Sequence, residues 1–226
     1  MNLRNVVLTV AGAGLLAGCG LTDSGLIVQG AYDPDPDGKG ECKFEANKQL
    51  SGGSVDVSVG QGFYLLLKLH SDMSSTELSN GNGETLITSQ RNTAYIQRKS
   101  VTYTVSDKSI RLPVWRVGET GTLAPGGELA LITSLIGGNS LKTLRDALIP
   151  GDEAKGRVDV TATVALEGEL ASGAPIAMRP FTYTFTAYTT GTTCPAGQIP
   201  SPNGPCGNPG QFAPAVCIDP ASLTKP

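Results

Sequence analysis

The clearest fold signal lies in residues 158–166, Val-Asp-Val-Thr-Ala-Thr-Val-Ala-Leu, and in residues 181–187, Phe-Thr-Tyr-Thr-Phe-Thr-Ala. Apolar side chains occupy alternate positions in both segments, which is typical of a β-strand that buries one face. Ser172-Gly173 lies between them and favours a turn. The sequence therefore predicts a long β-hairpin. We expect its aromatic stripe to face the core, and an outward-facing sugar-stacking platform is the alternative. The stripe consists of Phe181, Tyr183 and Phe185.

Further segments with strand character precede this hairpin. Residues 55–59 alternate valine with polar residues, and residues 63–69 form an apolar run that predicts a more fully buried strand. Four more segments are rich in β-branched, aromatic or aliphatic residues: 94–96, 101–105, 114–117 and 129–132. The single tryptophan, Trp115, belongs to one of these segments and is a candidate for the centre of the core.

One segment departs from the β pattern and predicts a short helix. Asn139-Ser140 supplies a cap, and Pro150-Gly151 supplies a stop. Between them, leucines recur with helical spacing at Leu141, Leu144 and Leu148. Seven or more short strands with one connecting helix predict an all-β, immunoglobulin-like β-sandwich, and a barrel is the alternative. The resemblance to immunoglobulin domains is architectural only, because the Cys-Trp-Cys spacing of antibody-type domains is absent.

The N-terminal residues have the order of an export signal. Arg4 precedes an apolar stretch, residues 6–16, that is too short to cross a bilayer. Leu16-Ala17-Gly18-Cys19 resembles the lipobox of bacterial lipoproteins. That resemblance implies cleavage before Cys19 and lipid of the palmitate type on this cysteine. Gly20 in place of aspartate favours the outer membrane in a Gram-negative organism. An ordinary secretory leader with a chance cysteine is the alternative.

These signals divide the chain into four predicted parts. Residues 1–18 are the signal peptide, and residues 19–43 are a lipidated, flexible tether with an acidic Asp-Pro segment. Residues 44–190 form the β-sandwich, and residues 191–226 form a loop-rich tail rich in Cys, Pro and Gly.

Four cysteines remain once Cys19 is assigned to lipid. An even number in an exported chain favours two disulfides, and the sequence leaves all three pairings open. At least one bridge must lie within the tail, and we expect Cys42 to tie the tail to the start of the domain. Zinc is the less favoured alternative, because thiolate sites use closer spacing. The four are Cys42, Cys194, Cys206 and Cys217.

A cluster of acids before the sandwich has two interpretations. Asp33, Asp35 and Asp37 alternate and are followed by Gly38, which is how an EF-hand calcium loop begins. The twelfth position is Phe44 instead of the required glutamate. A proline-stiffened linker is therefore the preferred interpretation. A weak calcium site of another kind is the alternative, and no other cofactor is expected.

Charge and motifs argue against several functions. The net charge of −3 becomes one unit more negative when Arg4 is removed, and no basic run occurs, so we expect no nucleic-acid partner. His70 is the single histidine, no nucleophile elbow accompanies it, and we expect a hydrogen-bonded residue at a strand end. The acidic pairs Asp152-Glu153 and Glu167-Glu169 are expected on the solvated surface.

Together these features predict a non-enzymatic lipoprotein of the cell envelope. It would be held on the membrane by its lipid anchor and would act as an interaction or structural module for a protein or glycan partner. Two alternatives stay open: a carboxylate-dependent hydrolase of envelope polymers and a calcium-stabilised binding module.

Overall fold

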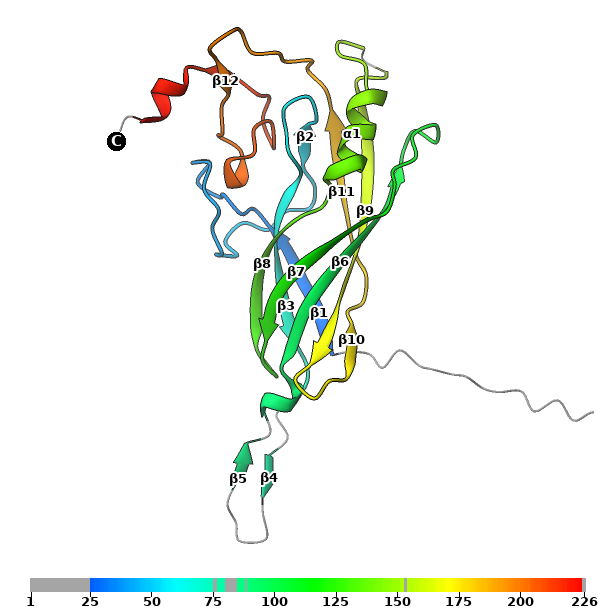
Figure 1. Cartoon of the computed structure of the whole chain (residues 1–226), viewed down its shortest axis with the longest axis vertical. Coiled ribbons are helices and arrows are strands. Elements are labelled where there is room, and N and C mark those ends of the chain that lie inside the picture. Colours follow the sequence, from blue (N-terminus) through cyan, green and yellow to red (C-terminus); the bar gives the residue numbers. More distant parts are fainter. Residues whose placement is uncertain (1–24, 75–76, 80–84, 88, 153, 225–226) are drawn as a thin grey trace, which may run out of the picture.

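The computed structural model describes residues 25–74, 77–79, 85–87, 89–152 and 154–224 (Figure 1). The predicted signal peptide and the lipidation residue Cys19 lie outside these ranges.

Two β-sheets face each other across a common core. The first has the strand order β1-β3-β8 and is antiparallel throughout. Its strands are β1 (Leu26–Tyr32), β3 (Tyr64–Ser71) and β8 (Glu128–Ser134). The second has the order β2-β11-β9-β6-β7, with β10 paired to β9. Its strands are β2 (Ser54–Asp56), β6 (Ala94–Val105), β7 (Trp115–Leu123), β9 (Arg157–Leu170), β10 (Pro175–Ala177) and β11 (Phe181–Tyr188).

The predicted hairpin is the centre of the second sheet. β9 and β11 are antiparallel, with Val160 opposite Phe185 and Val164 opposite Phe181. The valines of β9 and the aromatic residues of β11 share the inner face, so burial alternates along both strands. The core interpretation of the aromatic stripe is therefore confirmed: Tyr183 and Phe185 are buried, and Phe181 packs against the core.

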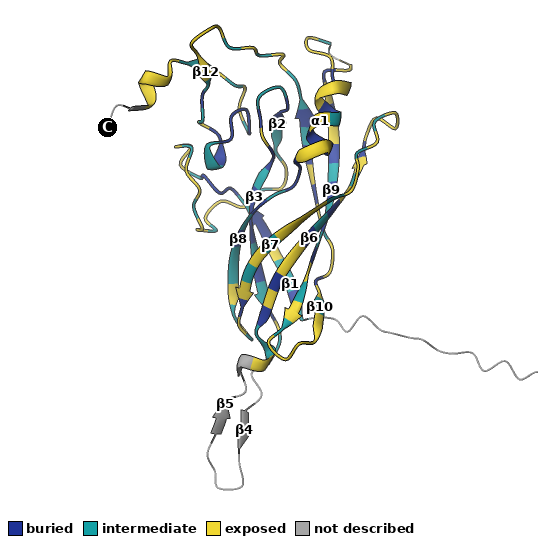
Figure 2. Cartoon of the chain, viewed as in Figure 1, coloured by how far each residue is buried: buried dark blue, intermediate teal, exposed yellow. Residues whose placement is uncertain are grey.

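The core lies between the two sheets (Figure 2). Phe63 and Phe185 stack near its centre with ring centroids 4.6 Å apart, one ring from each side of the sandwich. Trp115 is only partly buried and packs against the margin of the core, so it is not the core's centre. Trp115 is the first residue of β7 and is partly exposed there.

Two strand predictions change in length. The segments 94–96 and 101–105 belong to one long strand, β6, because the polar residues between them also pair with β9. The segment 55–59 is a strand only at β2, which lies parallel to β11. After Asp56 the chain turns, since the amides of Val59 and Gly60 both donate to the Asp56 carbonyl.

The predicted helix is α1 (Gly138–Ala147). Leu141 and Leu144 face the core, as their spacing indicated. The predicted cap is wrong in detail. Gly137 occupies the N-cap position without a side-chain hydrogen bond, whereas the Ser140 hydroxyl donates to the carbonyl of Pro113.

The tether prediction is wrong for residues 26–32, and residues 33–43 have no regular secondary structure. Residues 26–32 form the edge strand β1, which pairs with β3. The apolar side chains Leu26, Ile27 and Val28 were few but sufficient, because β3 offers a long apolar partner for them. Asp33 and Asp35 follow β1 directly and are buried.

The C-terminal tail is fastened to the sandwich by disulfides and buried amides. Cys42 bonds Cys206, and Cys194 bonds Cys217, so the bridge from the domain start to the tail is confirmed. The buried Gln211 side chain accepts from Tyr64 N (2.8 Å) and donates to Tyr64 O (2.7 Å), which imitates a neighbouring strand. The tail therefore continues the hydrogen bonding of β3.

Small elements complete the fold. They are β4 (Glu77–Ser79) paired with β5 (Thr85–Ile87), β12 (Ile199–Pro200) paired with β13 (Cys217–Ile218), and the short 3-10 helices η1 (Ser89–Asn92), η2 (Pro205–Gly207) and η3 (Pro220–Thr224). An all-β, sandwich-like fold with one α-helix and a disulfide-tied tail is confirmed.

Candidate functional site

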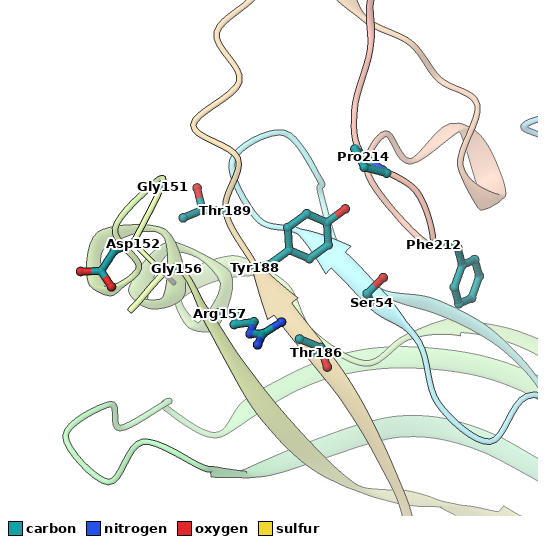
Figure 3. Close-up of a pocket in the computed structure, with 10 residues that line it drawn as sticks. All are labelled: Ser54, Gly151, Asp152, Gly156, Arg157, Thr186, Tyr188, Thr189, Phe212 and Pro214. Atoms are coloured by element: carbon teal, nitrogen blue, oxygen red, sulfur yellow. The ribbon is translucent and has the colours of Figure 1, made fainter. Parts of the chain in front are cut away.

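A cavity of about 630 Å³ opens where β9 begins and β11 ends (Figure 3). The segment after α1 forms one wall, and the tail forms the opposite wall. Its volume falls within the range of small-ligand sites in proteins. We call it the Arg157 pocket. Its lining residues are Ser54, Gly151, Asp152, Gly156, Arg157, Thr186, Tyr188, Thr189, Phe212 and Pro214.

Arg157 of β9 and Tyr188 of β11 lie side by side on neighbouring strands. They are directly paired in the antiparallel register of β9 and β11, so their side chains emerge on the same, outer side of the sheet. Arg157 is exposed, and its guanidinium makes no hydrogen bond or ion pair with any described residue. The pocket therefore contains a cation whose donors are available to a ligand.

The phenol of Tyr188 is a hydrogen-bond donor at all ordinary pH values. Burial raises the pKa of Tyr188, and the nearby Asp56 carboxylate raises it further. Asp56 itself is fully buried and is held by Ser58 and Thr190, whose hydroxyls both donate to its carboxylate. Tyr188 thus offers a ring face and a protonated hydroxyl to the pocket that Arg157 also lines.

The tail fixes the other side of the pocket. The Phe212 amide donates to Ser54 O (2.9 Å), and its ring packs edge-on against Phe63, with centroids 5.6 Å apart. Phe212 also has a positive φ of 65°. A residue other than glycine adopts this conformation only when its surroundings hold it there. The core contact and the amide bond provide that hold, so the pocket wall is anchored.

A regular patch of threonines lies on the same outer side of the sheet. Thr163 of β9 pairs with Thr102 of β6 and with Thr182 of β11. One step along the strands, Thr161 pairs in the same way with Thr104 and Thr184. We call these six residues the threonine face. These six residues carry no charge. On β11 the outer face continues through Thr186 to Tyr188 and the Arg157 pocket, and the Thr186 hydroxyl donates there to the exposed carboxylate of Asp159 on β9 (2.7 Å).

The acidic pairs have different surroundings. Asp152 lines the Arg157 pocket, but its Oδ1 accepts from the amides of Ala154 and Lys155 (2.9 Å each). Glu153 lies outside the described residues. On the outer side of the sheet, Glu167 is 3.5 Å from Arg98, and Glu169 accepts from Gln97 (2.8 Å). The expected surface position of Glu167 is confirmed by its exposure.

The aspartates considered for calcium bind protein groups. Asp33 Oδ1 accepts from the Asp35 amide (2.9 Å), and Asp33 Oδ2 is 3.3 Å from Lys48 Nζ. Asp35 accepts from the amides of Lys39 and Gly40. Asp37 pairs with Lys43, and this hydrogen bond lowers the pKa of Asp37. Within the described ranges no group of three or more His, Cys, Asp or Glu is arranged to hold a metal ion. Calcium binding stays an untested prediction.

His70 lies near the end of β3, as its sequence position indicated. Its Nε2 is 3.2 Å from the Asp72 carboxylate. Its Nδ1 is buried and has no partner among the described residues.

A second polar cluster is buried between the sheets around Lys99. The Lys99 ammonium is 3.0 Å from Glu119, donates to Ser134 O (2.9 Å) and to Thr133, and lies 4.9 Å from the ring centroid of Trp115. Burial lowers the pKa of Lys99, and Glu119 opposes that shift. Only 3% of the Lys99 side chain is exposed. The cluster ties β6, β7 and β8 together.

Comparisons with protein-family models, with curated proteins and with solved structures found no match. Across the described ranges, no helix combines the length and apolar character needed to cross a membrane.

Sequence reasoning missed Arg157 and the threonine face. The signal for the threonines was present, because residues 161–163 and 182–186 alternate threonine with core residues. The hairpin prediction depends only on the apolar residues of this alternation. The alignment of threonines across three strands depends on register, which a single sequence does not specify.

Proposed function

We propose that this chain is a lipid-anchored protein of the cell envelope that binds a glycan or protein partner without catalysing a reaction. The observation that carries the binding role is the pocket with an unpaired Arg157 beside Tyr188. Sites of this kind fix a ligand by a few polar groups against apolar walls. The lipobox carries the anchoring role, and Gly20 favours the outer membrane.

The position of the pocket supports this arrangement. β1 begins at the lower end of the sandwich in Figure 1, and the pocket lies between the upper ends of β9 and β11. Six peptide units join Cys19 to Gly25, and an extended chain spans roughly 3.5 Å per residue, so the anchor lies within about 21 Å of the described domain. A lipid at Cys19 would therefore hold the lower end near the membrane and leave the pocket facing away.

Mass spectrometry of the mature N-terminus tests the anchor. We expect a lipid-modified Cys19 in the parent protein, and we expect the Cys19→Ala variant to lack lipid and to leave the membrane fraction. An unmodified Cys19 in the parent would overturn the anchoring role.

Photo-crosslinking in the native envelope tests the binding role. A photoreactive residue at Tyr188 should give a discrete adduct, and one at the exposed Thr122 of β7 should not. Equal adducts from both positions, or none from Tyr188, would contradict binding at this pocket.

A further inference from the structure

We propose that the Arg157 pocket takes a carboxylate-bearing sugar of an acidic glycan, and that the threonine face holds neutral sugars next to it. This inference rests on the proposed binding function and names the ligand class of the same site.

Arg157 provides the specificity for a sugar that carries a carboxylate. The chain carries a net negative charge, yet Arg157 has no counter-ion among the described residues. A guanidinium presents planar, paired donors that match a carboxylate, and such charge-assisted bonds are about twice as strong as neutral ones. Among the described residues that line the pocket, Asp152 alone carries a carboxylate, and its Oδ1 is already bonded to backbone amides.

The remaining lining matches a sugar ring. A sugar has hydroxyls around its edge and C–H groups on its faces. The pocket offers hydroxyls from Ser54, Thr186 and Thr189 and ring surface from Tyr188 and Phe212. Aromatic rings with a polar group provide apolar contact and hydrogen bonding together. The pocket is large enough for more than a small anion, which would leave most of about 630 Å³ unfilled.

The sheet topology favours a glycan over an extended peptide. Peptides that bind sheets add a strand at a free edge and use backbone hydrogen bonds. β11 is paired with β9 along its whole length and with β2 at Thr186–Tyr188, so the backbone between Arg157 and Tyr188 is already hydrogen-bonded within the sheet. A ligand on this face therefore meets side chains, which here are mainly hydroxyls.

The threonine face extends the site beyond the pocket. Threonines on neighbouring strands lie about 4.8 Å apart, and alternate residues along a strand lie about 7 Å apart. The Thr161 and Thr184 hydroxyls bond each other at 2.9 Å. This hydroxyl-bearing surface joins the pocket along β11 through Thr186, whose hydroxyl donates to the Asp159 carboxylate. A glycan with one end at Arg157 would continue over it.

Calorimetric titration of the purified full chain in detergent tests the proposal. The probes are two tetrasaccharides, each with three neutral sugars and one terminal galacturonate or glucuronate, their methyl esters, and a tetrapeptide with a free C-terminal carboxylate. We expect at least one acidic tetramer to bind. We expect its ester to bind more weakly by about tenfold or more, and the peptide not to bind. Equal affinity for acid and ester, tight peptide binding, or no binding of either acidic tetramer would overturn the proposal.

Matched variants locate the binding. Arg157→Gln should weaken binding of the acid about tenfold and leave binding of the ester unchanged, whereas Thr184→Val should weaken both. The controls are Arg116→Gln and Thr122→Val, exposed residues of β7 away from the pocket, and neither should change affinity. Equal losses in control and pocket variants would contradict the assignment. Thermal melting of each variant confirms that it is folded.

The two proposals fail in different ways. Lipid on Cys19 and a Tyr188 adduct without uronate binding would overturn the acidic-glycan inference alone. Absence of both lipid and adduct would overturn the proposed function itself.

Discussion

Lys99 is buried because β6 contains an irregularity. The register of β6 shifts between Ile96 and Arg98, which reverses the alternation of its side chains. Lys99 therefore faces inward, where Glu119 and the Trp115 ring surround its ammonium. A buried ion pair does not by itself stabilise a fold, but breaking one partner leaves an uncompensated charge.

A double-mutant cycle tests whether removing one partner of this ion pair costs more stability than removing both. Glu119→Gln removes the carboxylate and should lower the free energy of unfolding by about 2 to 3 kcal/mol, because the Lys99 charge stays buried. Adding Lys99→Met to that variant should restore part of the loss. Chemical denaturation of both single variants and of the double variant measures the coupling. Strictly additive losses would show that the two side chains do not depend on each other.

Tyr183 differs from Lys99, because its buried hydroxyl has no hydrogen-bond partner among the described residues. Its ring belongs to the core, so only the oxygen is unfavourable there. Tyr183→Phe keeps the ring and should raise the free energy of unfolding by about 1 kcal/mol. Phe185→Leu at the next inward position is a useful contrast, since it loses ring contacts with Phe63 and should destabilise the protein. A destabilised Tyr183→Phe variant would indicate an unseen partner, such as water.

At the level of elements, the tail depends on bridges of very different span. Cys42 and Cys206 are separated by 164 residues, whereas Cys194 and Cys217 are separated by 23. The chain-entropy account predicts a larger stabilisation from the longer loop, because cross-linking it restricts the unfolded chain more.

Paired serine substitutions measure this difference. Replacing Cys42 and Cys206 should cost about 3 to 5 kcal/mol, and replacing Cys194 and Cys217 about 2 to 3 kcal/mol. Urea denaturation of the two double variants, with the intact protein as reference, gives both values. The amides of Asn208 and Gln211 remain bonded in the first variant, so the tail should stay docked at low denaturant. A larger loss from the shorter bridge would contradict the entropic account.

The elements show how far the sequence alone could lead. The hairpin of β9 and β11, the buried β3 and α1 follow from side-chain periodicity, which depends on local sequence. The sequence did not predict β1, because its few apolar residues form a strand only when they pair with β3, which is a long-range interaction. The pairing of cysteines and the alignment of threonines on three strands are also long-range, since they depend on topology and register. The candidate site is assembled from β9, β11 and the tail, so only its separate residue types were visible beforehand.

For the whole molecule, we expect the stability of the folded state to fall at alkaline pH. Burial raises the pKa of Tyr183 and of Tyr103 to about 12 from an ordinary value of 10.0. A raised folded-state pKa means that stability is complete below about pH 10 and is lost as pH rises towards 12. The advantage of Tyr183→Phe over the parent should therefore grow across that interval. Melting temperatures of both proteins from neutral pH to pH 11 measure it, and a constant difference would contradict the assignment.

The two disulfides interlock along the chain, since each joins a cysteine to the next but one. A chain that is translocated N-terminus first presents Cys42 and Cys194 to an oxidant before Cys206 arrives. Oxidation in order of arrival would thus join the wrong pair, and thiolate attack on that bond is needed to reach the observed connectivity. If the protein is exported as proposed and its cysteines are oxidised in that order, its biogenesis requires a disulfide isomerase as well as an oxidase.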